Sequence, residues 1–141
     1  MRIVLAIALL LVSQAVCEAQ EKAVTVGLIG DSTVAVQSGW GPAFVERFDS
    51  RAKIVNYAKN GATLQALSKK LDALVQLKPD YVLIQFGHND QKRYDTKVYA
   101  AHLQSYVERI RKAGGKPIIN KGTDLNGTAL AAAARPPPPC G

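Results

Sequence analysis

The stretch V-G-L-I-G-D-S, from Val26 to Ser32, decides the fold of this chain. Its apolar residues hardly alternate with polar ones and they stop at Gly30, which is typical of a strand that is buried on both faces of a sheet. Asp31 and Ser32 then stand side by side directly after the strand. The sequence therefore predicts a first strand over Ala23–Ile29 that carries a serine to the edge of a sheet.

Three further strands are predicted downstream, and two of them end in polar turns. Lys53–Tyr57 is a short strand that runs into a tight turn, indicated by Asn60-Gly61. Tyr81–Phe86 is the clearest strand in the sequence, and it ends in G-H-N-D at residues 87–90. A fourth strand is expected over residues 116–119.

Helices are predicted between these strands. Apolar residues at helical spacing place them over about 42–48, 64–77 and 96–112, with Pro42 at a first helical position and Thr63 able to cap the second helix. Alternating strands and helices favour right-handed βαβ units, and hence a parallel sheet that is covered on both faces. Because ligands bind outside the carboxyl ends of such strands, the three polar turns should meet at one rim.

Residues 1–19 have the pattern of a secretory signal peptide. A positive start precedes an apolar run over residues 3–12, and small residues up to Ala19 suit cleavage after that position. The run is shorter than the ~20 residues that a bilayer span requires, so an uncleaved anchor and lipidation at Cys17 are the less favoured alternatives. We expect an exported protein, secreted or periplasmic, with no stable membrane association after cleavage.

Composition and charge narrow the class of protein. The 141 residues fit one domain, and an apolar content of 48% is enough for a core. Cleavage would leave Cys140 as the single cysteine, which excludes an internal disulfide and a zinc site of the cysteine type. The formal charge of +7 favours anionic partners, but the basic residues are scattered as on solvated helix faces, and no aromatic interleaving suggests nucleic acid.

The chain changes character after Ile119. Residues 120–128 are polar, residues 130–134 are nearly all alanine, and four prolines at 136–139 favour an extended segment. We therefore expect a domain over 20–119 and an irregular Ala/Pro-rich tail over 120–141.

The polar turns suit acyl transfer. A serine hydroxyl is a poor nucleophile until a general base activates it, usually a histidine that a carboxylate orients. Acyl transfer also needs donors directed at the oxygen that becomes negative. Ser32 has the position of the nucleophile, and the backbone N–H groups of Ser32 and Gly61, with the side-chain amide of Asn89, could supply the donors.

Three blocks of sequence together resemble the SGNH (GDSL-type) hydrolases: G-D-S-T (30–33), N-Y-A-K-N-G-A-T (56–63) and F-G-H-N-D (86–90). The first and last blocks look most like the rhamnogalacturonan acetylesterase branch, and the resemblance covers about residues 24–119. It implies a flavodoxin-like three-layer α/β/α sandwich that removes acetyl groups from carbohydrate without metal or cofactor. By the same resemblance, Ser32 is the nucleophile, and Gly61 and Asn89 complete the oxyanion hole with the Ser32 amide.

One block of that family is missing. Its members carry the base in a late Asp-x-x-His block, and the only histidines of this chain are His88 and His102. We interpret His102 as a surface residue and His88 as a residue that shapes its turn or contacts substrate. Asp31 is interpreted as a turn-stabilising group and Asp90 as a turn residue or substrate contact, and with His88 these two form the predicted substrate-binding set.

The sequence therefore predicts an exported carbohydrate esterase, acting on acetylated polysaccharide such as pectin, whose hydrolysis is impaired because the base is absent. We expect a truncated or frame-shifted product, since the family's last strand and helix are missing as well. A non-catalytic carbohydrate-binding module is the alternative, and a chain that does not fold stably is a third, because one sheet edge would be bare. Trp40 and Tyr57 stay open between core and sugar-stacking roles, and the oligomeric state is not predicted.

Overall fold

The computed structural model describes residues 22–120, so the predicted signal peptide and the tail from residue 121 lie outside the described residues. The elements in that range are β1 (Val24–Gly30), α1 (Gly41–Val45), β2 (Ala52–Asn56), α2 (Ser68–Gln76), β3 (Tyr81–Gln85), the 3-10 helix η1 (Asp90–Lys92), α3 (Thr96–Lys112) and β4 (Lys116–Ile119). A membrane-crossing helix is not found among them, since none combines the required length with the required apolar character.

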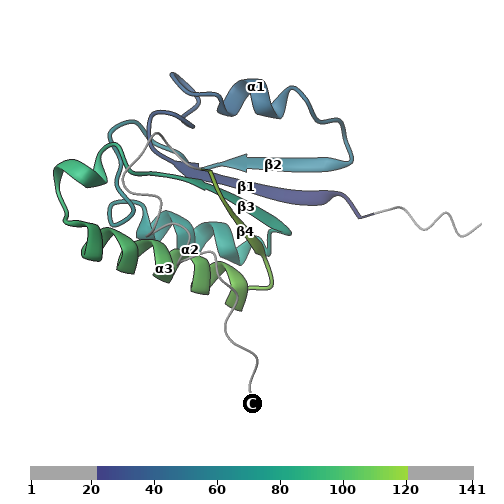
Figure 1. Ribbon diagram of the computed structural model, residues 1–141. Helices are drawn as coiled ribbons and strands as arrows, with labels where there is room; N and C mark the ends of the chain where they lie inside the picture. Colours follow the sequence, from purple (N-terminus) through teal and green to yellow (C-terminus); the bar gives the residue numbers. More distant parts are fainter. Residues whose placement is uncertain (1–21, 121–141) are drawn as a thin grey trace, which may run out of the picture.

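Within residues 22–120 the strands form one parallel sheet in the order β2-β1-β3-β4. Helix α1 lies on one face of this sheet, and α2 and α3 lie together on the other (Figure 1). The handedness of crossovers explains the division, because the chain moves one way along the sheet from β1 to β2 and the opposite way from β2 to β3 and β4. This order is the flavodoxin-like one, and the predicted α/β fold class is confirmed.

The larger hydrophobic core lies between the sheet and the pair α2 and α3. Successive strand residues point to opposite faces, so Val82 and Ile84 of β3 face this core whereas Leu83 between them faces α1. Gly27 of β1 also faces it, and a Cβ there would lie 2.7 Å from Leu74 Cδ1. Helix α2 can therefore pack directly against β1. The buried members of this core are Ile29, Ala62, Leu64, Leu67, Leu71, Leu74, Val82, Ile84, Phe86, Leu103, Tyr106 and Ile110.

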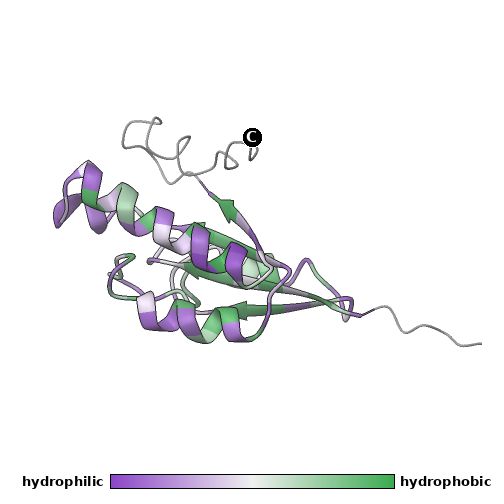
Figure 2. Cartoon of the chain, turned by 90° about the horizontal axis from the view of Figure 1, so that it is seen from below, coloured by the Kyte–Doolittle hydropathy of each residue, from purple (hydrophilic) through white to green (hydrophobic). Residues whose placement is uncertain are grey.

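The smaller core lies on the α1 side of the sheet. Its buried members are Val26, Leu28 and Val34, and the half-buried rings of Trp40 and Phe44 pack against them. The hydropathy colouring shows strands that are largely hydrophobic and helices that carry hydrophilic residues beside hydrophobic ones (Figure 2). The two faces of the sheet are thus both apolar but unequally covered.

Two predicted helix boundaries are wrong. Helix α2 begins at Ser68 rather than Leu64, because Thr63 Oγ1 accepts the Ala66 N–H and caps a separate turn, after which Leu67 leaves the helical region (φ −99°, ψ 11°). Helix α1 ends at Val45 rather than Phe48, because the N–H groups of Arg47 and Phe48 bond to carbonyls three residues back rather than four. By contrast, the predicted helix over 96–112 and strand over 116–119 are confirmed.

Candidate active site

The three predicted polar turns meet at the carboxyl ends of β1, β2 and β3. The Asp31 N–H donates to the Gln85 carbonyl (3.2 Å), and the Lys59 N–H donates to the Gly30 carbonyl (3.0 Å). The Asn89 side-chain amide donates to the Ala62 carbonyl (3.1 Å) and so joins the third turn to the second. The meeting point lies at the carboxyl ends of the neighbouring strands β1 and β3, where the strand order reverses and where ligands bind in sheets of this kind.

Ser32 lies in a tightly held turn after β1. The Asp31 carboxylate accepts the Thr33 N–H (2.9 Å) and the Thr33 hydroxyl (2.7 Å), which fixes the backbone on either side of the serine. The Ser38 hydroxyl lies 3.0 Å from the Ser32 carbonyl and 2.9 Å from Asn60 Oδ1. Ser38 therefore links the turn that holds Ser32 to the turn after β2, a role that no sequence pattern indicated. Ser32 itself is half-buried.

Gly61 stands in the left-handed region, with φ +71°, which a glycine adopts without strain. A Cβ at this position would meet no atom within 4 Å, and the residue is exposed. The space beside its backbone is therefore open, as the approach of a substrate to the Gly61 N–H would require.

Asn89 is half-buried, and its bond to the Ala62 carbonyl uses one of the two hydrogens of its amide nitrogen. The bond fixes the plane of the amide and leaves the second hydrogen for another acceptor. A neutral donor held in this way is suited to an oxyanion, because it needs little reorganisation when charge develops.

Asp31 and Asp90 are both buried at this rim. Their exposed fractions are 1% and 0%, and the Asp90 Oδ1 atom accepts the Leu64 N–H (3.0 Å) beneath the rim. Burial raises the pKa of Asp90, the Leu64 N–H opposes that rise, and the charge of Asp31 adds to it. Both carboxylates hold turns in this structure, and a contact of either with substrate stays a prediction.

Tyr99 of α3 completes this buried region, and sequence reasoning missed it. Its hydroxyl donates to the Phe86 carbonyl (3.3 Å). Burial, with the nearby charges of Asp90 and Asp31, raises the pKa of Tyr99 to about 12. The phenol therefore stays neutral and acts as a donor beneath the third turn.

Neither histidine is paired with the serine. His88 is exposed at the rim, with Nε2 at 3.2 Å from Lys92 Nζ, so a contact with substrate stays a prediction. His102 is half-buried rather than a plain surface residue: its ring packs edge-on against Tyr94, and its buried Nδ1 has no hydrogen-bond partner. Among residues 22–120, no hydrogen bond joins a histidine to the Ser32 hydroxyl.

Trp40 and Tyr57 both pack as core residues. The Trp40 indole N–H donates to Gln85 Oε1 (2.7 Å), and its ring meets Phe44 edge-on. Tyr57 packs against the larger core, with Lys70 Nζ 5.5 Å from its ring centre. A sugar-stacking role is not supported for either. In the part of the chain that the structure describes, no three His, Cys, Asp or Glu side chains are grouped so that they could hold a metal ion.

This chain is similar in sequence to one family of known proteins. The chain matches the model of the GDSL-like Lipase/Acylhydrolase family over residues 28–140. It is 36% identical over 113 residues to the rhamnogalacturonan acetylesterase RhgT of Bacillus subtilis (strain 168), which is 70% of this chain and 49% of that protein. It is 28% identical over 109 residues to the probable rhamnogalacturonan acetylesterase YesY of the same organism, which is 65% of this chain and 50% of that protein. The chain thus spans about half the length of these curated relatives.

Two solved structures are also similar. One is the psychrotrophic esterase EstA from Pseudoalteromonas sp., in a structure inhibited by monoethylphosphonate, with a TM-score of 0.58 and 26% sequence identity. The match covers 67% of this chain and 57% of the EstA chain. The other is the structure of TesA, with a TM-score of 0.62 and 25% sequence identity. The match covers 77% of this chain and 66% of the TesA chain.

Proposed function

Because the chain belongs to the GDSL-like lipase/acylhydrolase family, we propose that it is an exported carbohydrate esterase domain that acts on acetylated polysaccharide such as pectin. The names of the two curated relatives support a carbohydrate acetyl ester as the substrate class. The pattern of residues 1–19 supports export.

The single observation that carries this proposal is the hydrogen-bonded meeting of the three turns at the point where the strand order reverses. It brings a half-buried serine, an open glycine backbone and an oriented asparagine amide to one rim. In the proposed reaction, Ser32 Oγ attacks the acetyl carbonyl carbon and loses its proton to a base. The amides of Ser32, Gly61 and Asn89 stabilise the resulting oxyanion. The sugar hydroxyl then leaves with a proton, and water releases acetate from the acyl-serine.

No general base for Ser32 is identified among the described residues. No hydrogen bond joins a described histidine to Ser32, and the sequence has no Asp-x-x-His block. Loss of the histidine base from a serine hydrolase costs about 10⁶-fold in kcat, and the oxyanion donors and binding alone leave about 10³–10⁴-fold over water. We therefore propose that hydrolysis by this chain is slow. The same observation favours a second candidate function, in which the rim binds acetylated carbohydrate without turnover.

Hydrolysis of 4-nitrophenyl acetate by the full chain tests the proposal. The wild-type rate should lie close to that of Ser32→Ala, with Ser105→Ala, an exposed serine on α3, as the matched control. Rapid turnover that Ser32→Ala abolishes would overturn the impairment and reveal a working base. Titration calorimetry with acetylated rhamnogalacturonan fragments then tests binding, which Asn89→Ala should weaken. If the wild-type chain neither binds these fragments nor hydrolyses the ester, both candidate functions are wrong.

A further inference from the structure

A closed loop over residues 33–40 joins the turn after β1 to helix α1. The Trp40 N–H donates to the Thr33 carbonyl (2.9 Å), which closes the loop, and the Gly39 N–H donates to the Ala35 carbonyl (2.8 Å) within it. A Cβ at Gly39 would lie 2.4 Å from the Thr33 carbonyl oxygen, so the two ends of the loop are in direct contact. The backbone of the loop therefore defines its own shape.

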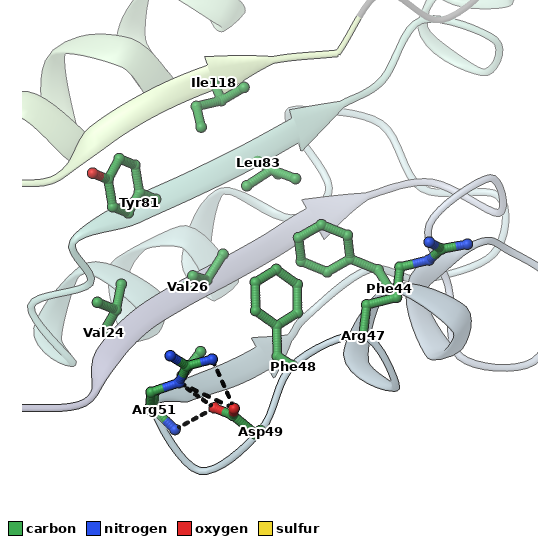
Figure 3. A pocket seen from close by; sticks show the side chains of 11 residues that line it. Val24, Val26, Phe44, Arg47, Phe48, Asp49, Arg51, Tyr81, Leu83 and Ile118 are labelled. Atoms are coloured by element: carbon green, nitrogen blue, oxygen red, sulfur yellow. Dashed lines mark hydrogen bonds and ion pairs between the residues drawn. The ribbon is translucent and has the colours of Figure 1, made fainter.

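The far end of this loop is anchored to the sheet. The Trp40 indole N–H donates to Gln85 Oε1 at the end of β3 (2.7 Å), and its ring meets Phe44 edge-on with the centres 5.5 Å apart. Phe44 lies over the sheet in an apolar groove that Leu83 also lines (Figure 3). These anchors do not involve the exposed side chain of Ser38, so the loop should keep its position when that side chain is changed.

The tip of the turn after β2 is held much less firmly. On either side of the tip, the N–H groups of Lys59 and Ala62 donate backbone hydrogen bonds of 3.0 and 3.1 Å. Asn60 and Gly61 themselves are exposed, and in the described chain neither makes a backbone hydrogen bond. The hydrogen-bonding contact that the structure gives this tip is the one between Asn60 Oδ1 and the Ser38 hydroxyl (2.9 Å).

We propose that Ser38 is a positioning residue that fixes the Gly61 N–H relative to the Ser32 N–H, and so sets the spacing of the two backbone donors of the oxyanion hole. This role rests on the proposed function, in which both N–H groups stabilise an oxyanion. The Ser38 hydroxyl lies 3.0 Å from the Ser32 carbonyl as well as 2.9 Å from Asn60 Oδ1, so one side chain bridges the two turns. The peptide group between Asn60 and Gly61 carries the Gly61 N–H, and holding the Asn60 side chain restricts its rotation.

The hydrogens of this bridge can satisfy all of its members. A serine hydroxyl has one hydrogen, so it donates to only one of the two oxygens, and its own oxygen can accept from a second group. A half-turn of the Asn60 amide exchanges its oxygen and nitrogen and brings the nitrogen to Ser38. Asn60 then donates to Ser38, and Ser38 donates to the Ser32 carbonyl. The two turns are joined in this arrangement by two hydrogen bonds in series.

Oxyanion donors depend on such positioning, because each must lie about 2.7–3.1 Å from the oxygen that becomes negative. Gly61 has φ +71° and open space beside it, so packing does not hold its N–H in one direction. A typical net hydrogen bond corresponds to about a two- to tenfold change in an equilibrium constant. Loss of the Ser38 bridge should therefore weaken the binding of an oxyanion at this rim by about that factor.

Backbone-amide NMR of the full chain, titrated with methylphosphonate as a tetrahedral oxyanion, tests the proposal. In wild type the N–H signals of Ser32 and Gly61 should shift together with one Kd. Ser38→Ala should raise that Kd about two- to tenfold, and it should lower the heteronuclear NOE of the Gly61 amide, which reports ps–ns mobility. Ser38→Thr keeps the hydroxyl and should restore both values. Ser105→Ala, which changes an exposed serine on α3, should match wild type.

Asn60→Ala removes the other half of the bridge and completes a double-mutant cycle. Because the two side chains act through each other, Ser38→Ala, Asn60→Ala and the double variant should all weaken methylphosphonate binding to the same extent. Effects of the single variants that add up in the double variant would contradict the proposal.

The titration also separates failure of this proposal from failure of the proposed function. If Ser38→Ala binds methylphosphonate with the wild-type Kd and an unchanged Gly61 NOE, the oxyanion hole stands and Ser38 does not position it. If methylphosphonate leaves the Ser32 and Gly61 signals of the wild-type chain unshifted, the rim holds no oxyanion. Both the role of Ser38 and the proposed hydrolysis would then be wrong.

Discussion

Replacement of Asp90 by Asn is expected to stabilise the fold at neutral pH, although Asp90 is completely buried and hydrogen-bonded. Its Oδ1 atom accepts the Leu64 N–H, and its Oδ2 atom is buried without a partner. Burial raises the pKa of the carboxyl group, with the charge of Asp31 adding to the rise. The folded protein therefore prefers the neutral carboxyl, and at pH 7 it carries an ionised group that it disfavours. Asparagine keeps the acceptor for Leu64 and removes the charge.

The direction of this pKa shift fixes how the stability gained by Asp90→Asn depends on pH. Each unit by which folding raises the pKa corresponds to about 1.4 kcal/mol of stability lost once the group is ionised. The pKa of Asp90 in the folded protein lies above its unfolded value of about 3.9. The stabilising contribution of the protonated carboxyl is therefore fully present below the unfolded pKa, and it is lost as the pH rises through the folded pKa. The stabilities of wild type and Asp90→Asn should therefore be similar near pH 4 and should diverge toward pH 7. For a domain of this size, 1 kcal/mol changes the Tm by about 4–8 °C.

Thermal unfolding of wild type, Asp90→Asn and Asp90→Ala over a pH series measures this. Asp90→Ala removes the acceptor, so the buried Leu64 N–H loses its partner and about 1–3 kcal/mol should be lost at every pH. The reasoning would be refuted if Asp90→Asn were as destabilised as Asp90→Ala at pH 7. A difference between wild type and Asp90→Asn that does not vary with pH would refute it as well.

Three further substitutions test other contacts. Tyr106→Phe removes the buried hydroxyl that donates to the Leu64 carbonyl at 2.6 Å, and it should lower the unfolding free energy by about 1–3 kcal/mol in urea titration. Gly30→Ala places a Cβ 2.6 Å from the Gln85 carbonyl oxygen, so the turn that holds the candidate nucleophile must shift, and the Tm should fall more than for Gly61→Ala. Gly61→Ala meets no atom and should cost only about 1 kcal/mol of backbone strain, so an equal loss of Tm in the two variants would contradict this order.

The fold could be predicted because its elements depend on local patterns. The apolar run before Gly30 and the run Y-V-L-I-Q-F at residues 81–86 predict buried strands, and parallel crossovers then fix which turns meet at the rim. Helix α3 was predicted over its full length, and the structure adds Asp95 as its cap, with the side chain accepting the Val98 N–H (2.9 Å). The turns that contain glycine could be predicted for the same reason, because a backbone with positive φ favours glycine.

The contacts beneath the rim could not be predicted, because they depend on distance in space. Asp90 and Leu64 are 26 positions apart, and Ser38 and Asn60 are 22 apart. A carboxylate next to a candidate oxyanion donor resembles a substrate contact in sequence, and only burial shows that Asp90 faces inward. The start of α2 was misplaced because apolar spacing continues through the turn that Thr63 caps, and spacing alone does not distinguish one turn from the first turn of a helix.

The position of Trp40 in the smaller core determines what its fluorescence can report. It is the one tryptophan of the sequence, it packs against Phe44 on the α1 side, and the helices α2 and α3 lie on the opposite face of the sheet. Its emission is therefore sensitive to the loosening of one layer, whereas far-ultraviolet circular dichroism is dominated by the 26 helical residues of the other. Whether the two optical signals change together on heating thus shows directly whether the two sides of the sheet unfold as a single cooperative unit.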